Sequence, residues 1–204
     1  MPELIDKWIS CSLANKDEKL NKLAKEVNTD KHTKSCQKGN DPCRFSFPRL
    51  PSDRTLISNP LSKEDLCKEI YQKKLDESNK VLSEMEKNEL KKSSLELGKD
   101  LYKKTLKAAK DILKTVKNKL LEMTEEDLEK YSLDTILTEL KISSVDYHNA
   151  LGISERGKTV VLKRKPNDMW VNNYNPQMMK AWHANMDIHF VWIAMQSLLT
   201  SQTT

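Results

Sequence analysis

The chain has 204 residues, of which 32% are charged and 37% hydrophobic, and its formal net charge is +5 at pH 7. This length suits one domain of ordinary size or a small domain with an added module, and the composition is not polar enough for disorder throughout. No apolar run approaches the ~18 residues of a membrane span. The N-terminal stretch MPELIDKWIS carries acids and has no long apolar segment, so we expect no secretory signal. The four cysteines are therefore expected to be reduced or bound to metal.

Positive charge is concentrated in two segments. Residues 31–54 hold six basic and two acidic side chains, and residues 156–165 hold five basic side chains and no acid. The rest of the chain is consequently net negative. Clustered positive charge of this kind suits the phosphate backbone of a nucleic acid, and its alternative is a solvated surface that serves only solubility.

Two short helices are expected near the N-terminus, over residues 3–9 and 15–28. Residues 29–60 are rich in Pro, Asn, Asp, Gly and Ser, and they are predicted to be a loop. A loop of this length needs additional interactions to stay ordered, and a bound metal ion can supply them. Ser62, followed by Asp65, predicts the capped start of a long polar helix.

A stripe of apolar residues spaced by four and three positions predicts a second long helix. Its members are Tyr102, Leu106, Ala109, Leu113, Val116 and Leu120. This spacing places all six on one helix face, and two long helices in this order can form an antiparallel hairpin. We favour core packing for the stripe over its alternative use as a surface that binds another protein.

Several short helices are expected over residues 124–151, and a small β component follows them. TVVL at 159–162 is β-branched and apolar, Pro166-Asn167 can turn the chain, and Trp170-Val171 can return, which predicts a β-hairpin over 158–173. A helix is expected over residues 176–183 and a buried strand at MDIHFV, residues 186–191.

The expected fold class is α+β. It comprises a predominantly helical insert with a long helical hairpin, a zinc-knuckle-like loop and a small β-hairpin or sheet remnant. In chain order we expect a Cys/His zinc-binding segment over residues 1–60 and the helical insert over 61–152. A basic hairpin with the remnant of a sheet follows over 153–191, and residues 192–204 are expected to be an unrelated tail.

A metal site is one interpretation of the sequence KHTKSCQKGNDPC. The candidate ligands in it are His32, Cys36 and Cys43. Structural zinc takes four ligands in a tetrahedron, and Cys11 is the candidate for the fourth, with Asp30 as an oxygen alternative. The resulting pattern, Cys-x20-His-x3-Cys-x6-Cys, is weaker evidence than a double Cys-x2-Cys, and Cys67 is expected to be a spectator. The alternative is a loop with two reduced thiols and an exposed histidine.

Arginines and phenylalanines alternate in RFSFPR, and three basic residues adjoin the predicted hairpin. The candidate nucleic-acid contacts are Arg44, Phe45, Arg49, Arg54, Lys163, Arg164 and Lys165. Aromatic faces stack on unpaired bases while cations hold phosphates. The alternative for the aromatic residues is that Phe45 and Phe47 pack the loop onto the domain, which we expect for at least one of them. The alternative for 163–165 is a generic basic turn.

No catalytic motif stands out in the sequence. Residues 152–159, GISERGKT, match the letters GxxxxGK[ST], but helices are expected before them and a β run after them, which is the reverse of the strand–loop–helix order of a phosphate-binding loop. There is no distinctive Ser/His/Asp pattern, and we expect neither ATPase activity nor nucleotide binding. Tyr174 has the most suggestive context for a nucleophile. However, Asn173-Tyr174-Asn175-Pro176 is typical of a turn at a helix start, where we expect the hydroxyl to cap or pack.

Three stretches in order resemble the N-terminal replication-initiator region of Helitron and Helentron transposon proteins, many of which are described as ATP-dependent DNA helicases. They are LIDKWISCSL, KHTKSCQKGNDPCRFSFPRLPSDRTLI and VVLKRKPNDMWVNNYNPQMMKAWHANMDIHFV. The resemblance covers residues 4 to 191. Its most specific parts are the CRFxFP box after the His/Cys cluster and the KRKP…NNYNP…NMDI block.

The resemblance implies zinc ligands at Cys11, His32, Cys36 and Cys43, with Asp30 where the family often has a further histidine. In that family a His–hydrophobic–His motif upstream binds the nicking metal. A Tyr-x2-Lys element and a superfamily-one helicase lie downstream. By this resemblance the chain begins after the His–hydrophobic–His motif and ends before the tyrosine element, so we expect neither catalytic element in it, and His189 stands where the family usually has glutamine.

We therefore expect an internal, zinc-stabilised fragment of a nuclear replication initiator that binds single-stranded DNA without turnover of its own. The remainder of a transposon protein is its other expected partner. The alternative is a helical protein-interaction module derived from a transposon, which docks through the stripe at 102–120 and does not bind DNA.

Overall fold

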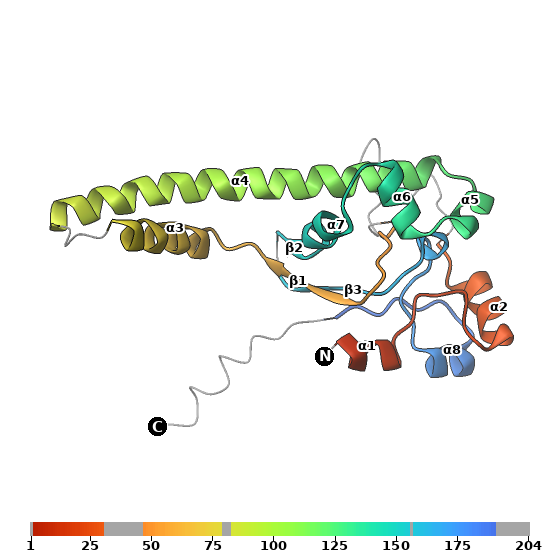
Figure 1. Ribbon diagram of the computed structural model, residues 1–204. Coiled ribbons are helices and arrows are strands. Elements are labelled where there is room, and N and C mark those ends of the chain that lie inside the picture. The colour runs from red at the N-terminus through yellow and green to blue at the C-terminus, as the bar shows by residue number, and fades with distance from the viewer. Residues whose placement is uncertain (1, 31–46, 79–82, 156, 191–204) are drawn as a thin grey trace, which may run out of the picture. The chain divides into compact units, whose positions relative to one another are not determined.

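Helices dominate the fold, and three short strands form one small sheet (Figure 1). The computed structural model describes residues 2–30, 47–78, 83–155 and 157–190. The expected class, α+β and predominantly helical with a long helix, is confirmed. The expected zinc-knuckle-like loop and the tail at 192–204 lie outside the described residues. Among the residues that are described, no helix is both long enough and apolar enough to cross a membrane.

The elements are mostly helices, with one strand before α3 and two strands after α7. The helices are α1 (Pro2–Trp8), α2 (Glu18–Val27), α3 (Lys63–Glu77), α4 (Glu84–Glu122), α5 (Glu125–Lys130), α6 (Leu133–Glu139), α7 (Ser144–Leu151) and α8 (Pro176–Trp182), with the 3₁₀ turn η2 (Pro166–Asp168). The strands are β1 (Leu56–Pro60), β2 (Ile153–Ser154) and β3 (Thr159–Val161), in the sheet order β2-β1-β3. β1 pairs with β2 in parallel.

The chain divides into two compact units built from non-contiguous ranges. Unit 1 comprises Met1–Ile57, Thr124–Leu133 and Lys158–Thr204, and unit 2 comprises Ser58–Met123 and Asp134–Gly157. The sequence analysis had divided the chain into consecutive segments instead. The helical insert corresponds largely to unit 2, whereas the N-terminal segment and most of the C-terminal segment belong to unit 1.

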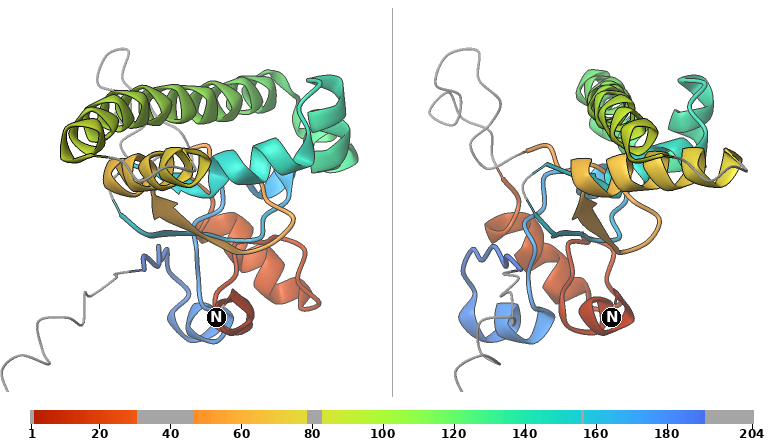
Figure 2. Two further views of the ribbon diagram at one scale, coloured as in Figure 1. Left: turned by 60° about the vertical axis from the view of Figure 1, so that its left-hand side comes forward. Right: turned by 90° about the vertical axis from the view of Figure 1, so that its left-hand side faces the viewer.

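Unit 2 contains the predicted helical hairpin; α3 begins at the predicted cap, Ser62, whereas α4 begins at Ser83, a cap that was not predicted. The Ser62 hydroxyl accepts the Asp65 N–H at 3.1 Å, and Ser83 forms a reciprocal capping box with Glu86 at the start of α4. α3 and α4 lie antiparallel and side by side (Figures 1 and 2). Lys74 Nζ donates to Ser93 Oγ at 2.6 Å, near the turn of the hairpin.

The two helices of the hairpin approach closely at Gly98. A Cβ atom there would lie 2.3 Å from the Sγ atom of Cys67, so glycine is needed for α4 to pass this close to α3. Nearer the open end, the Lys63 ammonium lies 4.8 Å from the centroid of the Tyr102 ring. From the first contact to the second, the residue number falls from 67 to 63 in α3 and rises from 98 to 102 in α4, as in an antiparallel pair.

The apolar stripe on α4 belongs to the core of unit 2. Ala109, Val116 and Leu120 are buried, and α4 packs against α7, which contributes the fully buried Tyr147. Core packing of the stripe is thereby confirmed. These three buried side chains cannot dock another protein, as the alternative requires of them, whereas Tyr102, Leu106 and Leu113 are only half-buried.

Two predicted β elements are wrong. The hairpin over 158–173 does not form: β3 ends at Val161 and neighbours β1, which the sequence analysis had placed in a loop. Val171 instead makes an isolated antiparallel bridge with Thr29. The predicted strand at 186–191 is also absent over its described residues, 186–190.

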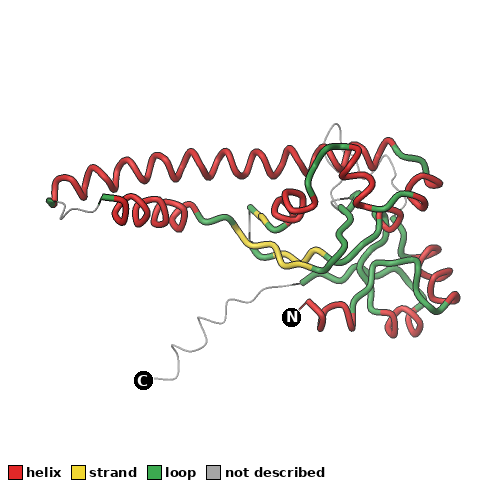
Figure 3. Tube along the Cα trace, in the orientation of Figure 1, coloured by secondary structure: helices red, strands yellow, loops and turns green. Residues whose placement is uncertain are grey.

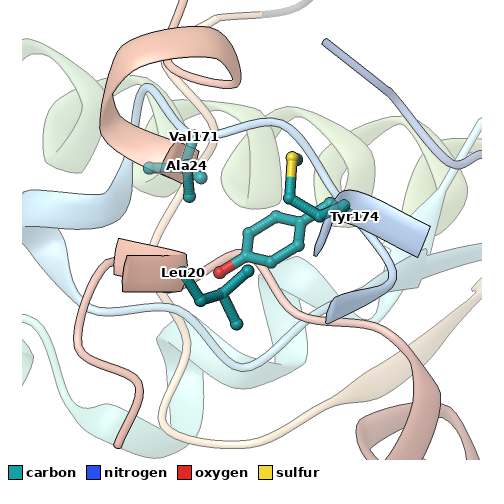
Figure 4. Close-up of a cluster of buried hydrophobic side chains, with 5 residues drawn as sticks. Leu20, Ala24, Val171 and Tyr174 are labelled. Atoms are coloured by element: carbon teal, nitrogen blue, oxygen red, sulfur yellow. The ribbon is translucent and has the colours of Figure 1, made fainter. Parts of the chain in front are cut away.

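Unit 1 is mainly irregular backbone framed by short helices, as the colouring by secondary structure shows (Figure 3). Its apolar cluster is small and lies between α2 and α8. The members are Leu20, Ala24, Val171, Tyr174 and Met179 (Figure 4). The cluster joins residues from the two ends of the chain into one core.

Candidate nucleic-acid interface

Residues 163–175, which include the η2 turn, form a spine whose extended parts pair with three N-terminal segments. Arg164 and Ser52 exchange backbone hydrogen bonds of 2.8 and 2.9 Å, and Tyr174 and Ser10 exchange two of 2.8 Å. Between these bridges, the Asn172 N–H donates to the Asn28 carbonyl at 2.9 Å. The spine therefore holds residues that are far apart in the sequence and sets the positions of the basic side chains it carries.

Asparagine side chains fasten the spine to its neighbours. Asn28 Nδ2 donates to the Asn172 carbonyl at 2.9 Å, and Asn28 Oδ1 accepts the Met186 N–H at 2.9 Å. Asn173 Nδ2 donates to the Ile188 carbonyl at 3.1 Å. These bonds hold residues 186–188 without a strand, which is the physical reason that the predicted strand at MDIHFV is not needed.

Tyr174 is a packed structural residue. Its ring is fully buried, and its hydroxyl donates to the Ser12 carbonyl at 2.6 Å and accepts from Asn15 Nδ2 at 2.8 Å. Burial is the largest cause that raises the pKa of the phenol, which is the opposite of what an activated nucleophile needs. The expectation that this hydroxyl packs is confirmed.

Arg164 does not lie on the surface. It is 5% exposed, and its guanidinium donates to the carbonyls of Asp168 and Val171, each at 2.6 Å, and to Asn173 Oδ1 at 3.0 Å. Burial is also the largest cause that lowers its pKa. Since its donors serve the interior of unit 1, the prediction that Arg164 contacts a nucleic acid is wrong.

Three further charges accompany Arg164 in the interior or at its edge. Asp168 is 1% exposed; its Oδ1 accepts the Leu13 N–H at 2.9 Å, and burial raises its pKa. Arg49 Nη2 pairs with Asp187 Oδ2 at 2.8 Å. Two arginines and two aspartates balance in charge, so the group suits a structural network rather than an ion-binding site.

Only some of the nucleic-acid contacts predicted near RFSFPR belong to the described residues. Arg44 and Phe45 lie outside them. Phe47 is buried and stacks on Trp170 with centroids 6.0 Å apart, which confirms that at least one of the two phenylalanines packs. Arg49 lies 5.0 Å from the Phe47 ring and is already paired with Asp187.

Three predicted cations are exposed. Lys163 and Lys165 flank the buried Arg164 in an extended segment, where successive side chains point to opposite sides. Arg54 is exposed two residues after Ser52, which bridges to Arg164. Lys163, Lys165 and Arg54 are called the exposed cation set below. The exposed Asp53 lies between the bridge and Arg54.

Cys11 lies in a setting that suits a neutral thiol. It is buried, its Sγ donates to the Lys163 carbonyl at 3.2 Å, and burial raises its pKa to about 11. Zinc binds the thiolate, so this setting does not favour Cys11 as a ligand. Within the described residues no three metal-ligating side chains gather.

The other predicted zinc ligands, His32, Cys36 and Cys43, lie outside the described residues. Asp30, the alternative fourth ligand, is described and is the last residue before that segment; its N–H donates to the Trp170 carbonyl at 2.8 Å. The zinc site therefore stays a prediction, and Asp30 competes with Cys11 for the fourth position.

The buried role of Arg164 and the asparagine contacts were not predicted from the sequence. A signal for the first was present, because LKRKP alternates buried and exposed side chains with the period of an extended strand. The density of asparagines in VNNYNP was a weaker signal, since asparagine also favours turns.

Comparison of the chain with protein-family models, with curated proteins and with solved structures gives no match. The likeness to Helitron-type initiators accordingly remains a prediction carried by the motifs quoted above.

Proposed function

We propose that this chain binds single-stranded DNA through the exposed cation set, as a zinc-stabilised part of a transposon-encoded replication initiator that acts in the nucleus. It has no nicking or ATPase activity of its own in this proposal. The observation that carries the proposal is the outward placement of Lys163 and Lys165 on a spine whose other side is locked into unit 1 by Arg164. A rigid row of cations of this kind is suited to phosphates.

The decisive experiment reverses the charge of the exposed cation set. The Arg54→Glu/Lys163→Glu/Lys165→Glu variant should bind a fluorescent oligothymidine at least roughly tenfold more weakly than the wild type at moderate salt. Each phosphate contact on a single strand contributes about −0.7 to the slope of log affinity against log salt, so losing three contacts should flatten that slope by about 2. Fluorescence anisotropy at several salt concentrations measures both quantities.

A variant with the same charge change provides the control. Lys103, Lys107 and Lys114 are exposed on α4 in unit 2, and their replacement by Glu changes the net charge of the chain equally. This control should keep the affinity of the wild type within about twofold, because it leaves the spine untouched. Equal losses in both variants, or no binding by the wild type, would refute the proposed function.

The zinc part of the proposal has its own measurement. We expect one equivalent of zinc in the purified protein by atomic emission, and its loss in Cys36→Ser. Cys67→Ser is the matched control, since Cys67 lies in α3 against α4 and should not affect the metal. Comparing Cys11→Ser with Asp30→Asn then identifies the fourth ligand.

A further inference from the structure

The helical hairpin carries an open groove on one side. Its floor is formed by Cys67 and Tyr71 of α3 and by Leu95 of α4, and its volume is about 350 Å³. Leu95 is 47% exposed. Ser94 also lines the groove; it is buried, and its hydroxyl has no hydrogen-bond partner within the described part of the chain. The floor is thus largely apolar and partly open to solvent.

Lysines surround this floor. Lys68, Lys91 and Lys92 line the groove, and no acidic side chain does. Lys68 lies 3.9 Å from Asp65 in a highly exposed pair, which contributes little. Lys91 and Lys92 make no ion pair with any residue that the structure describes. The rim therefore presents an excess of positive charge beside apolar surface.

The groove on the other side of the hairpin has a different charge pattern. It is lined by acids as well as lysines, and there Lys104 pairs with Asp100 at 2.8 Å. Two acids there, Glu77 and Asp100, offset most of the charge of the three lysines, Lys73, Lys74 and Lys104. The contrast shows that positive charge at the first groove is a local property and not a general consequence of the lysine-rich helices.

α3 is incompletely covered as well. None of its 15 residues is buried, although all of them are described. A helix gains most of its stability from packing an apolar face, so a helix that buries none of its side chains fully has room for a further partner. A third helix laid along the groove would cover Tyr71 and Leu95 together.

We propose that this groove binds an acidic amphipathic helix of another protein. The apolar residues of such a helix, spaced by three and four positions, would cover the floor, and its flanking carboxylates would meet the three lysines. A second copy of this chain would bring lysines against lysines, and a nucleic acid would leave the apolar floor without an apolar partner. Charge complementarity therefore favours the acidic helix.

The probe is a synthetic helix of about three heptads, with leucines in one stripe and glutamates beside it. The matched probe has lysine in place of each glutamate. We expect the acidic helix to bind at least roughly tenfold more tightly than the basic one, and to slow alkylation of Cys67. Mass spectrometry of the Cys67 peptide follows that alkylation independently of the other cysteines.

Two charge-reversal variants separate this proposal from the proposed function. Lys68→Glu/Lys91→Glu/Lys92→Glu should lose the acidic helix and keep oligothymidine. The variant of the exposed cation set should do the opposite. Circular dichroism checks the helix content, and Leu95→Ala, a single exposed change, should weaken helix binding even where the triple variant fails to fold.

Several results would overturn the proposal. They are equal binding of the acidic and basic helices, unchanged alkylation of Cys67, and full binding by the groove variant. Protection of Cys67 by oligothymidine would identify a nucleic acid as the occupant. Concentration-dependent self-association in sedimentation that protects Cys67 and is lost in the groove variant would identify a second copy.

Discussion

The interior of unit 1 and the interior of unit 2 are stabilised by different kinds of interaction. In unit 2, buried apolar residues of the stripe on α4 pack against α7. Its backbone hydrogen bonds are formed mainly within the helices. Unit 1 has a small apolar cluster and relies on backbone bridges, buried asparagines and the Arg164 network. The difference teaches that irregular backbone can be fixed by side-chain hydrogen bonds where helices and strands are too short to do so.

The same difference separates the two proposed surfaces. In unit 1, buried polar contacts hold the backbone in place. Lys163 and Lys165 point outward from that backbone, so its contacts determine where the two side chains begin. In unit 2, the lysines project from a regular hairpin, and their positions follow from helix geometry. Variants that damage one kind of support should leave the other unit folded.

The largest effect is expected from Arg164→Met. This change removes the donors to two carbonyls and to Asn173 and leaves Asp168 buried without its neighbouring cation, so the free energy of unfolding should fall by roughly 3–5 kcal/mol. Urea denaturation measures it. Lys165→Met is the matched control and should cost less than about 0.5 kcal/mol, because Lys165 is exposed. Similar losses in the two variants would contradict the buried network.

A smaller effect is expected from alkaline titration of Cys11. Burial raises its pKa from 9.0 to about 11, so the folded protein keeps this proton where the unfolded chain has lost it. The resulting contribution to stability is complete below pH 9 and is lost as pH rises towards 11. Two pKa steps correspond to about 3 kcal/mol.

The measurement compares urea denaturation of the wild type and of Cys11→Ala between pH 8 and pH 11, so that titration of the lysines and other common groups cancels. The stability advantage of the wild type should shrink with rising pH. A flat difference would contradict the buried neutral thiol. A difference that instead titrates below neutral pH and disappears with a chelator would indicate a zinc-bound thiolate at Cys11.

The smallest effect is expected in the hairpin of unit 2. Gly98→Ala places a methyl group against Cys67 Sγ and should lower the stability of the hairpin by about 1–2 kcal/mol, despite the higher helix propensity of alanine. In the Cys67→Ala background the loss should be smaller, because the Sγ atom is gone, although the Cα and Cβ atoms at position 67 still lie 3.0 and 3.2 Å from the new methyl group. Circular dichroism melting curves of the four variants form a double-mutant cycle, and additive effects would contradict the close approach.

Local patterns in the sequence determined most helices and their starts. Ser62 with Asp65 and Ser143 with Asp146 lie three residues apart, and a helix cap needs nothing more distant. The stripe on α4 could also be predicted from the sequence, because helix periodicity alone places its residues on one face. The helical part of the fold class followed from these signals.

Tertiary structure alone decided the details of unit 1. Asn28 and Asn172 bond across 144 positions, and Asp168 accepts the N–H of Leu13 across 155. No local pattern specifies such partners, so the predicted β-hairpin and the predicted C-terminal strand were wrong. For the same reason, three adjacent basic residues separated into two exposed lysines and one buried arginine. The sequence by itself determined where helices form and where positive charge gathers. The fold decided which of those charges face solvent, because that depends on hydrogen-bond partners that only long-range packing brings near.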